Sequence, residues 1–567
     1  MYFMALAVDY DGTIAYDGSV NTETVEALIR VKASGRKLIL VTGRQLEELK
    51  QIFERLELFD RIVAENGALL YTPQTETQRQ LAEAPPETFL AKLKNCGIHP
   101  LKSGNVIVAT EEPHEKPVLD VIRDMGLELE IIFNKGSVMV LPSGINKSTG
   151  LAIALKELGL SMHNVIGIGD AENDHAYLNG VGLSVAVANA TDAIKKTATL
   201  VSKGAYGEGV QEVIDLLIKE ERSLTPYIRC KINIGLQEES IELNPLDRIL
   251  IAGNSGIGKS TLATMLTEKI VEAGLQFCIF DPEGDYEKLE NAIGVGDGKL
   301  SPSQEQVIEL LEDPLRNVVV NTLGVELVER PSFFMELAPK LVSLKARTGR
   351  PHWLIVDEAH HLMPAAQNNV SLALPKEGTL LITVHPCEVA AHALQSLTVI
   401  IALGPQAPQV LKEVSQIIGE ALPNVPIQAP AENEILIWFR TPTNMIKTIK
   451  ADKPKQQHKR HTRKYATGDL SEEFCFYFRG PKNKMNLKAQ NLTIFLQIAE
   501  GIDDLTWMHH LQRHDYSDWF RDYIKDETLA QDTIQIENDL SLSAVESRRA
   551  IASLVKERYT APASAKD

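Results

Sequence analysis

Residues 9–13 read DYDGT and directly follow the apolar run at residues 5–8. Far downstream, residues 253–260 read GNSGIGKS and directly follow a second apolar run at residues 249–252. A short apolar run that ends in a polar or glycine-rich loop is typical of a buried strand in a parallel sheet. Both loops carry residue types that handle phosphate, so the sequence predicts two α/β units with separate sites.

The pattern around the first loop predicts a doubly wound parallel sheet over residues 1–217. Buried-strand candidates alternate there with segments of helical period. The candidates are residues 3–8, 37–41, 165–168 and 183–187. Between about residues 72 and 140 the pattern changes to alternating strands mixed with helix-like segments, which we interpret as an inserted cap.

A second doubly wound unit is predicted over residues 228–450. Its strand candidates are residues 248–252, 276–280, 317–320, 353–356, 379–384, 398–403 and 434–439. Residues 451–467 are polar and basic, and a solvated linker is favoured there over a nucleic-acid contact. Residues 468–567 are aromatic-rich at first and helical afterwards; core packing of the aromatics is favoured over stacking on bases. The predicted fold class is α/β, with two parallel-sheet units and a mainly helical C-terminal module.

The composition is that of an ordinary globular protein, with 44% hydrophobic and 24% charged residues among 567. A formal net charge of −18 counts against a broad, nonspecific nucleic-acid coat. The five cysteines include no C-x-x-C pair, which favours a reducing compartment over a disulfide framework or a zinc site. There is no signal-peptide pattern and no apolar run of roughly 18 residues, so we expect a cytoplasmic protein without membrane contact.

Asp9 and Asp11 are predicted to share one site, because side chains two apart on extended chain point the same way. In phosphoryl transfer, one carboxylate attacks phosphorus and the other protonates the leaving oxygen and later activates water. Splitting the displacement into two steps lowers each barrier. The alternative is that two acids before a Gly-Thr turn only cap a helix.

Three further segments favour the phosphoryl-transfer interpretation. Thr42 and Gly43 follow the second strand candidate, where a hydroxyl and backbone N–H groups can hold phosphate oxygens. Lys147 supplies a positive point charge. Asp170 and Asp174 follow the strand at 165–168 and offer oxygen ligands for a hard cation such as Mg²⁺.

These pieces, in this order, resemble the haloacid dehalogenase superfamily of phosphohydrolases. The cap, with residues 65–68 (ENGA) and 187–190 (VANA), resembles its Cof and sucrose-phosphate phosphatase branch. The resemblance covers about residues 1–215 and implies Asp9 as nucleophile, Asp11 as acid/base, and Thr42 and Lys147 as phosphate binders. The implied Mg²⁺ ligands are Asp9, Asp11, Asp170 and Asp174. Further candidate contacts to phosphate or substrate are Gly12, Thr13, Gly43, Arg44, Asn66 and Asn173.

The second loop has the G-x-x-x-x-G-K-[ST] pattern, whose backbone N–H groups wrap a triphosphate. Lys259 is expected to contact the terminal phosphates, and Ser260 to ligate Mg²⁺. The strand at 353–356 ends in Asp357, which would hold the metal through water, and Glu358, which would polarise the attacking water. The predicted ATP-binding residues are Gly253, Asn254, Ser255, Gly256, Ile257, Gly258, Lys259, Ser260 and Thr261.

Residues 281–286 (DPEGDY), 357–361 (DEAHH) and 383–386 (TVHP) resemble the HerA and FtsK class of ring-forming ATPases over about residues 230–445. This resemblance implies ATP hydrolysis and a homo-oligomer. Val384 stands where many members of the class have a polar sensor, which counts against DNA pumping. Arg440 follows a strand candidate and is either an arginine finger or an ordinary salt-bridging residue.

The favoured function is a Mg²⁺-dependent phosphatase for a small phosphorylated metabolite, such as a sugar phosphate, fused to an ATPase that regulates or powers it. The second hypothesis is an oligomeric nucleic-acid motor with an end-trimming phosphatase, with a polynucleotide kinase-phosphatase as its close relative. The third is a non-catalytic scaffold that uses ATP as a switch. The acidity, the cap and Val384 count against nucleic acid as the partner.

Overall fold

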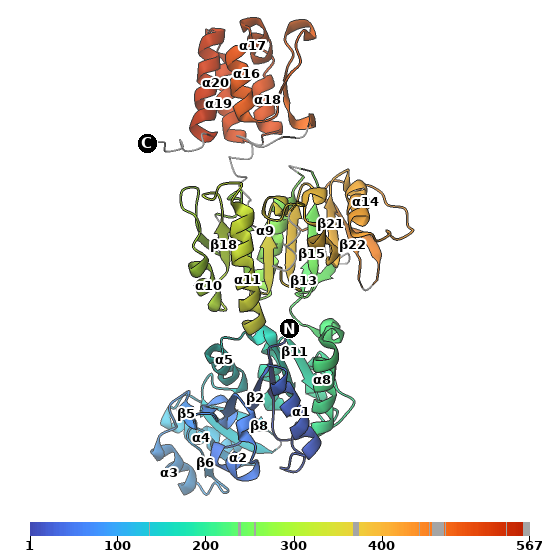
Figure 1. The fold of residues 1–567 in the computed structure, drawn as a ribbon. Coiled ribbons are helices and arrows are strands. Elements are labelled where there is room, and N and C mark those ends of the chain that lie inside the picture. Colours follow the sequence, from blue (N-terminus) through green and yellow to red (C-terminus); the bar gives the residue numbers. More distant parts are fainter. Residues whose placement is uncertain are drawn as a thin grey trace.

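The computed structural model describes residues 1–134, 136–235, 240–254, 257–287, 289–366, 374–441, 443–452, 454–455, 470, 472–524, 526–539 and 541–559. Figure 1 shows an N-terminal α/β unit, a second α/β unit beside it, and a C-terminal helical bundle. This arrangement confirms the predicted fold class. Among the described residues, none of the helices combines the length and apolarity that a membrane span requires.

The first unit is built on an eight-stranded sheet of order β12-β11-β10-β1-β2-β3-β4-β5. Its strands from β12 to β3 are parallel, and β4 and β5 extend the edge antiparallel. The strands are β1 (Ala5–Val8), β2 (Lys37–Val41), β3 (Arg61–Ala64), β4 (Leu69–Thr72), β5 (Thr77–Gln80), β10 (Val165–Gly169), β11 (Leu183–Ala186) and β12 (Leu200–Val201). The central strands are buried along their whole length, as their continuous apolar runs require.

Helices flank this sheet and fix the loops that follow its strands. They are α1 (Thr22–Ala33), α2 (Leu46–Ile52), α5 (Lys147–Glu157), α6 (His175–Gly180), α7 (Asp192–Thr197) and α8 (Tyr206–Glu220). Asn146 caps α5: its side chain accepts the backbone N–H groups of Ser148 and Thr149, and the hydroxyl of Thr149 accepts the N–H of Asn146. This capping box fixes the start of α5, where Lys147 lies.

The cap is a four-stranded antiparallel sheet of order β6-β7-β9-β8 covered by two helices. The strands are β6 (Lys102–Ser103), β7 (Val108–Glu111), β8 (Leu129–Asn134) and β9 (Ser137–Pro142), and the helices are α3 (Glu87–Asn95) and α4 (Glu115–Met125). Phe89, Leu93 and Val118 pack with Val140 in a small core of its own. The alternating segment at residues 129–133 lies in β8, whose side chains are half-buried or exposed; Leu129 and Ile131 pack against this core, and Ile132 packs against a second cluster.

The second unit has a nine-stranded sheet of order β17-β18-β16-β19-β20-β15-β21-β22-β23. The strands are β15 (Arg248–Ala252), β16 (Phe277–Asp281), β17 (Ile293–Val295), β18 (Val318–Asn321), β19 (Trp353–Val356), β20 (Thr379–Thr383), β21 (Val399–Leu403), β22 (Glu434–Phe439) and β23 (Met445–Lys450). The last two strands pair antiparallel. Lys447 and Lys450 lie on the edge strand, where charge protects an open sheet edge from further pairing.

Helices cover both faces of this sheet, and a small hairpin precedes it. The helices are α9 (Lys259–Glu272), α10 (Gln304–Glu312), α11 (Arg330–Thr348), α12 (Ala359–Leu362), α13 (Ala391–Gln395) and α14 (Ala407–Ile418). The hairpin pairs β13 (Ile232–Ile234) with β14 (Ile241–Leu243). The sheet separates two hydrophobic clusters, one on each face, as in a doubly wound unit.

The C-terminal module is a hairpin with five helices around an aromatic core. It comprises β24 (Phe476–Phe478), β25 (Leu487–Ala489), α16 (Leu492–Gly501), α17 (Asp504–Leu511), α18 (Asp515–Asp522), α19 (Glu527–Asn538) and α20 (Ala544–Tyr559). Phe495, Trp507, Tyr516 and Trp519 are all buried. The prediction that these aromatics pack in a core is confirmed.

Candidate active sites

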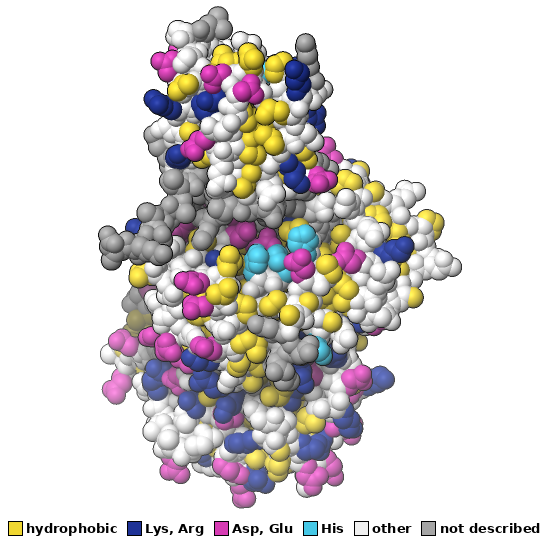
Figure 2. All heavy atoms as spheres, turned by 45° about the horizontal axis from the view of Figure 1, so that its top comes forward, with side chains coloured by type: hydrophobic (Ala, Val, Ile, Leu, Met, Phe, Trp, Pro, Cys, Tyr) yellow, Lys and Arg dark blue, Asp and Glu magenta, His cyan; other side chains and the backbone are white. Residues whose placement is uncertain are grey.

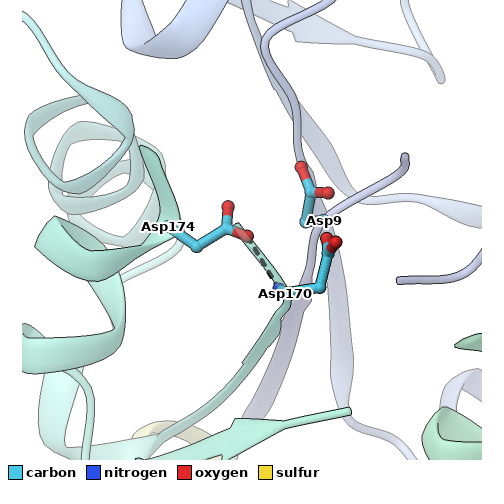
Figure 3. A group of neighbouring side chains, drawn as sticks. All are labelled: Asp9, Asp170 and Asp174. Atoms are coloured by element: carbon cyan, nitrogen blue, oxygen red, sulfur yellow. Dashed lines mark hydrogen bonds between the residues drawn. The ribbon is translucent and has the colours of Figure 1, made fainter. Parts of the chain in front are cut away.

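The first site lies at the carboxyl ends of β1 and β10, where three aspartates meet (Figure 3). Asp9 follows β1, Asp170 follows β10, and Asp174 ends the short turn before α6. One carboxylate oxygen from each lies within 4.8 Å of the other two, and all three residues are buried. A set of oxygen donors without nitrogen or sulfur fits a hard cation such as Mg²⁺.

Lys147 lies inside this group. Its Nζ donates to Oδ1 of Asp9 and to Oδ1 of Asp174, both at 2.6 Å, and its side chain is 1% exposed. Burial opposes the charged form of Lys147, but Asp174 and Asp9 outweigh it and raise its pKa. Three buried carboxylates against one ammonium leave an excess of negative charge, which a divalent cation would offset.

For Asp9, the surroundings favour the neutral form of the side chain. Burial raises the pKa of Asp9 well above its ordinary range, and the neighbouring Asp174 raises it further, while Lys147 lowers it. A carboxylate must be ionised to attack phosphorus, so positive charge beside Asp9 is a requirement of the nucleophilic role. Lys147 and a bound cation would both supply it.

Asp11 turns away from the three-aspartate group toward the entrance of the site. Both of its carboxylate oxygens accept from Arg44, at 2.6 Å from Nε and 2.7 Å from Nη2. The Asp11 side chain is 40% exposed, whereas Asp9 is buried. Asp9 and Asp11 thus line one cavity, but within the described residues the Asp11 carboxylate is not part of the metal-ligating group.

The other predicted phosphate contacts surround the same point. Thr13 donates its hydroxyl to Oδ1 of Asp170 at 3.0 Å, and the hydroxyl of buried Thr42 accepts the backbone N–H of Arg44 at 3.1 Å. Asn173 donates to Oδ1 of Asn66 at 3.2 Å. Among the described residues this leaves Nδ2 of Asn66 and Oδ1 of Asn173 buried without a partner. Such groups are costly unless a ligand satisfies them.

Gly12 and Gly43 provide space and backbone for this site. Gly12 has φ +85° and its carbonyl accepts Nδ2 of Asn189 at 2.7 Å, which ties the loop after β1 to the loop after β11. A Cβ on Gly43 would lie 3.5 Å from Nδ2 of Asn173. Gly43 thus lies in van der Waals range of Asn173, on the core side of the cavity.

A cavity of about 210 Å³ lies above Asp9, between the core and the cap. From the core it is lined by Asp9, Asp11, Gly43, Arg44, Gln45, Glu48, Lys147 and Asn173. From the cap it is lined by Lys102, Ile107, Ala109, Asn134, Ser137 and Met139. Lys102 lies 3.1 Å from Glu48, across the gap between cap and core. Sequence reasoning missed these cap residues, because they belong to no motif and lie on separate strands.

Glu65 fastens the cap to the core, a role that sequence reasoning also missed. It is fully buried, and its carboxylate accepts the backbone N–H groups of Asn105, Val106 and Ile107 at 2.8–3.0 Å. Its backbone has φ +50°, an unusual conformation for a residue with a side chain. In the sequence, the acidic residue in the segment at residues 65–68 was the feature from which this role could have been inferred.

The second site lies at the carboxyl ends of β15, β16 and β19. Lys259 begins α9, and its Nζ donates to the carbonyl of Asn254 at 3.0 Å. The hydroxyl of Ser260 donates to Asp285 at 3.2 Å. Gly253 and Gly258 have φ of +157° and +104°. Thr261 is the third residue of α9, and Ile257 is partly exposed beside the loop. The predicted contacts Ser255 and Gly256 lie outside the described residues.

Acidic residues converge on this loop from two strands. Asp281, at the end of β16, is fully buried and accepts the N–H groups of Gly284, Asp285 and Tyr286 at 2.7–3.0 Å. Burial raises the pKa of Asp281 to about 7, and Asp285 contributes. Asp357 follows β19, and its Oδ1 accepts the N–H of Glu358 at 2.8 Å. Burial, and next Glu358, raise the pKa of Asp357.

Figure 2 shows a concentration of histidine side chains beside acidic ones on the face it draws. His360 and His361 have ring centroids 4.1 Å apart, and His385 lies 5.8 Å from His360. Nδ1 of His360 lies 3.0 Å from the hydroxyl of Thr383 and 3.5 Å from Glu358. His360 thus connects the end of β20 with the acid that follows β19.

Arg440 is engaged within its own chain. Its guanidinium pairs with Glu420 and donates to the carbonyls of Gln395 and Leu397 at 2.9 and 2.6 Å. The Arg440 side chain is 8% exposed. Of the two interpretations of this residue, the salt-bridging one fits these contacts.

Comparison with known proteins matches the two α/β units separately. The family model for haloacid dehalogenase-like hydrolases matches residues 6–123 and 128–214, and the model for the central domain of the helicase HerA matches residues 239–421. The phosphoglycolate phosphatase of Methanothermobacter thermautotrophicus is 31% identical over 220 residues, which are 37% of this chain and 96% of that protein. The 5-amino-6-(5-phospho-D-ribitylamino)uracil phosphatase YcsE of Bacillus subtilis is 29% identical over 235 residues, 37% of this chain and 93% of that protein.

A solved haloacid dehalogenase-like hydrolase from Bacteroides thetaiotaomicron is 20% identical to this chain, with a TM-score of 0.34. It matches 38% of this chain and 99% of its own.

Proposed function

Because the chain belongs to the haloacid dehalogenase-like hydrolases and is a phosphomonoester hydrolase, we propose that it cleaves a small phosphorylated metabolite through an aspartyl-phosphate on Asp9. One observation carries this proposal. Asp9 lies buried at the floor of a cavity, 2.6 Å from Lys147 and grouped with two further aspartates. A nucleophile, a positive charge and a cation site therefore coincide.

The reaction has two steps. An oxygen of Asp9 attacks phosphorus and the bond to the leaving oxygen breaks, while Asp11 gives that oxygen a proton. Asp11 then takes a proton from water, which attacks phosphorus and releases phosphate, restoring Asp9. Lys147 and the backbone N–H of Gly43 would offset the charge on the phosphoryl oxygens. Bound at Asp9, Asp170 and Asp174, Mg²⁺ would shield the anionic nucleophile from the anionic phosphate.

Arg44 orients the acid/base residue. Its two hydrogen bonds hold Asp11 at the entrance, on the side of the cavity where the leaving group would lie. The Asp11 carboxylate is half-exposed and reaches solvent, which suits a group that exchanges protons with water.

The charge of the cavity favours a small phosphorylated acid. Arg44 on the core side and Lys102 on the cap side carry positive charge in the lining of this cavity of about 210 Å³. A carboxylate at the other end of the substrate would pair with Lys102 in place of Glu48. 2-Phosphoglycolate has this form, and relatives of the first unit are named for it. Sugar phosphates are the competing class.

The second unit, in this proposal, binds and hydrolyses ATP with Mg²⁺ and regulates the phosphatase. The match to the HerA central domain supports an ATPase. Lys259 would contact the terminal phosphates, Ser260 and Asp357 the metal, and Glu358 the attacking water. Thr383 would orient His360, and His360 would in turn orient Glu358.

The match to a helicase domain also supports a second candidate, an oligomeric nucleic-acid motor. Val384 at the sensor position and a formal charge of −18 count against it. Salt-sensitive DNA binding together with DNA-stimulated ATP turnover would favour the motor, and ATP turnover indifferent to DNA would favour the metabolic enzyme.

The proposal is tested by phosphate release from 2-phosphoglycolate, a panel of sugar phosphates and 5′-phosphorylated oligonucleotides, with Mg²⁺ and with EDTA. We expect fast Mg²⁺-dependent turnover of one small monoester. Turnover confined to oligonucleotides would contradict the metabolic proposal, and turnover unaffected by EDTA would contradict the metal assignment. Asp11→Asn is the matched variant, because it keeps the size of the side chain and one of the two acceptors for Arg44 but cannot exchange the proton.

A further inference from the structure

The two α/β units meet through buried polar side chains at the amino ends of their strands. Figure 1 shows the chain's N-terminus at this junction. From the first unit come residues 2–4, which lead into β1, and His163 and Asn164, which lead into β10. From the second come Gln276, which precedes β16, and His352, which precedes β19. The bases of the two sheets therefore face each other.

A hydrogen bond between Asn164 and His352 joins the two bases. Nε2 of His352 lies 3.1 Å from Oδ1 of Asn164, and both side chains are buried. Nδ1 of His352 accepts the backbone N–H of Gln276 at 2.8 Å, so the ring proton is on Nε2 and is donated to Asn164. Nδ2 of Asn164 donates to the carbonyl of Tyr2 at 2.8 Å. One imidazole and one amide thus link the starts of four strands.

Each of these four strands ends at an active-site acid. β1 leads to Asp9 and β10 to Asp170 in the phosphatase; β16 ends at Asp281 and β19 leads to Asp357 in the ATPase. Asn164 and Asp170 are six positions apart along β10, which is about 20 Å at roughly 3.3 Å per residue. The two sites lie at opposite ends of one path. It runs from β1 and β10 in the first unit, through the hydrogen bond between Asn164 and His352, to β16 and β19 in the second unit. Buried strands of this kind move as rigid elements.

The surrounding contacts pack the two units closely against each other. Arg350, fully buried, donates to the carbonyl of Gly159 in the first unit at 2.9 Å and to Gln276 Oε1 at 3.0 Å. A Cβ on Gly349 would lie 2.6 Å from Nδ2 of Asn164, and one on Gly274 would lie 2.7 Å from Nε2 of His163. Backbone of the second unit therefore touches these side chains directly. A tilt of one sheet displaces the strand starts of the other.

We propose that His352 is a positioning residue which, through its hydrogen bond to Asn164, transmits nucleotide binding in the second unit to the phosphatase site. This inference rests on the proposed function and names the route of its regulation. ATP bound at Lys259 and Asp357 shifts β16 and β19, and the junction passes that shift to β1 and β10, which carry Asp9 and Asp170. A coupling free energy of 1–3 kcal/mol between two such sites corresponds to about 5- to 150-fold in affinity.

The test uses the full chain and a generic monoester. Hydrolysis of 4-nitrophenyl phosphate with Mg²⁺ is measured with and without a non-hydrolysable ATP analogue, and we expect kcat/KM to change about fivefold or more, at the lower end of typical coupling. His352→Asn keeps an acceptor for the N–H of Gln276 but is too short to reach Asn164. In this variant the analogue should still bind and basal turnover should persist, but the nucleotide effect should be lost.

His352→Gln is the conservative variant, because its amide nitrogen lies near the place of Nε2 and can donate to Asn164; it should restore the effect. Glu377→Gln is the matched control, since it removes an ion pair that crosses the junction, 3.9 Å from the amino terminus, and leaves the hydrogen bond between His352 and Asn164 intact. It should respond to nucleotide as the wild type does. Asn164→Ser breaks the same hydrogen bond from the other side and replaces His352→Asn if that variant does not fold.

The outcomes separate this inference from the proposed function. Wild-type protein that performs both reactions with no mutual effect, or His352→Asn that keeps the full nucleotide effect, overturns the coupling and leaves the two activities standing. Absence of monoester hydrolysis, or hydrolysis that survives Asp9→Asn, overturns the proposed function itself. A nucleotide effect that persists in Lys259→Ala would place nucleotide binding elsewhere and also overturn the coupling.

Discussion

The two sites hold their lysines in different ways. Lys147 lies between two carboxylates, 2.6 Å from each, and is 1% exposed. The described hydrogen bond of Lys259 goes instead to a backbone carbonyl of its own loop, that of Asn254 at 3.0 Å. The lysine of the first site is thus positioned by carboxylates from two other segments, whereas the described contact of the second lysine lies within the loop that the sequence predicts to bind phosphate.

The largest expected effect on turnover comes from substituting Asp9 in the first site or Lys259 in the second. Asp9→Asn should lower phosphatase turnover at least about 10³-fold, because an amide does not form the phosphoenzyme. ATP hydrolysis should be retained. Lys259→Ala should do the reverse. Both activities are measured on the same preparations, and loss of both in either variant would contradict two separate sites.

The two lysines should differ in how much they contribute to the free energy of unfolding of their units. Lys147→Met leaves Asp9 and Asp174 buried without their counter-charge, which should cost the first unit about 5 kcal/mol, the upper range for breaking a buried ion pair. Lys259→Met removes the hydrogen bond of a buried ammonium to a backbone carbonyl, and we expect it to cost the second unit about 1.5–3 kcal/mol. Native-state hydrogen exchange of β1 and β15 measures the two separately, and equal costs would contradict the comparison.

When no ligand is bound, the free energy of unfolding of the second unit should depend on pH because of the acidic residues at its site. The folded pKa of Asp281 is raised from 3.8 to about 7, so folding favours its protonated form. The stabilisation is complete below the unfolded pKa and is lost as pH rises through the folded pKa. Between about pH 4 and 7, the second unit should lose up to about 4 kcal/mol.

Asp281→Asn should reduce this dependence, and the raised pKa of Asp357 should leave a residual slope of the same sign. The measurement is hydrogen exchange of β16 in EDTA, without nucleotide. Asp313→Asn, a change at a half-exposed acid away from the site, is the control and should keep the wild-type slope. A wild-type slope that is unchanged in Asp281→Asn would contradict the assignment of the slope to this residue.

The smallest effect concerns the cap side of the first site. Lys102→Met should raise KM for 2-phosphoglycolate about fivefold with little change in kcat, because the side chain is largely exposed and touches only the far end of the substrate. KM for 4-nitrophenyl phosphate, which has no carboxylate, should stay the same. An equal rise for both substrates would contradict a role in carboxylate recognition.

Much of the fold could be predicted because the signals are local. The apolar runs at residues 5–8 and 353–356 are strands β1 and β19, each followed at once by the acids its motif predicts. The resemblance to the haloacid dehalogenase superfamily implied that Asp9 and Asp170 share one site. They lie together because strand ends meet at one edge of a parallel sheet. Asp11 was expected beside Asp9 on the same face. Its pairing with Arg44 was not predictable, because no rule of spacing selects that partner.

The sequence by itself determined the two α/β units, the helical module and the chemistry of their loops, because short motifs with strand and helix periods depend on neighbours in the chain. The tertiary structure alone decided the cap face of the cavity, the fastening of the cap by Glu65 and the junction of the units. Asn164 and His352 are 188 residues apart, and neither belongs to a motif. An amide and an imidazole acquire a specific partner only when folding buries them side by side, where an unpaired polar group would be costly.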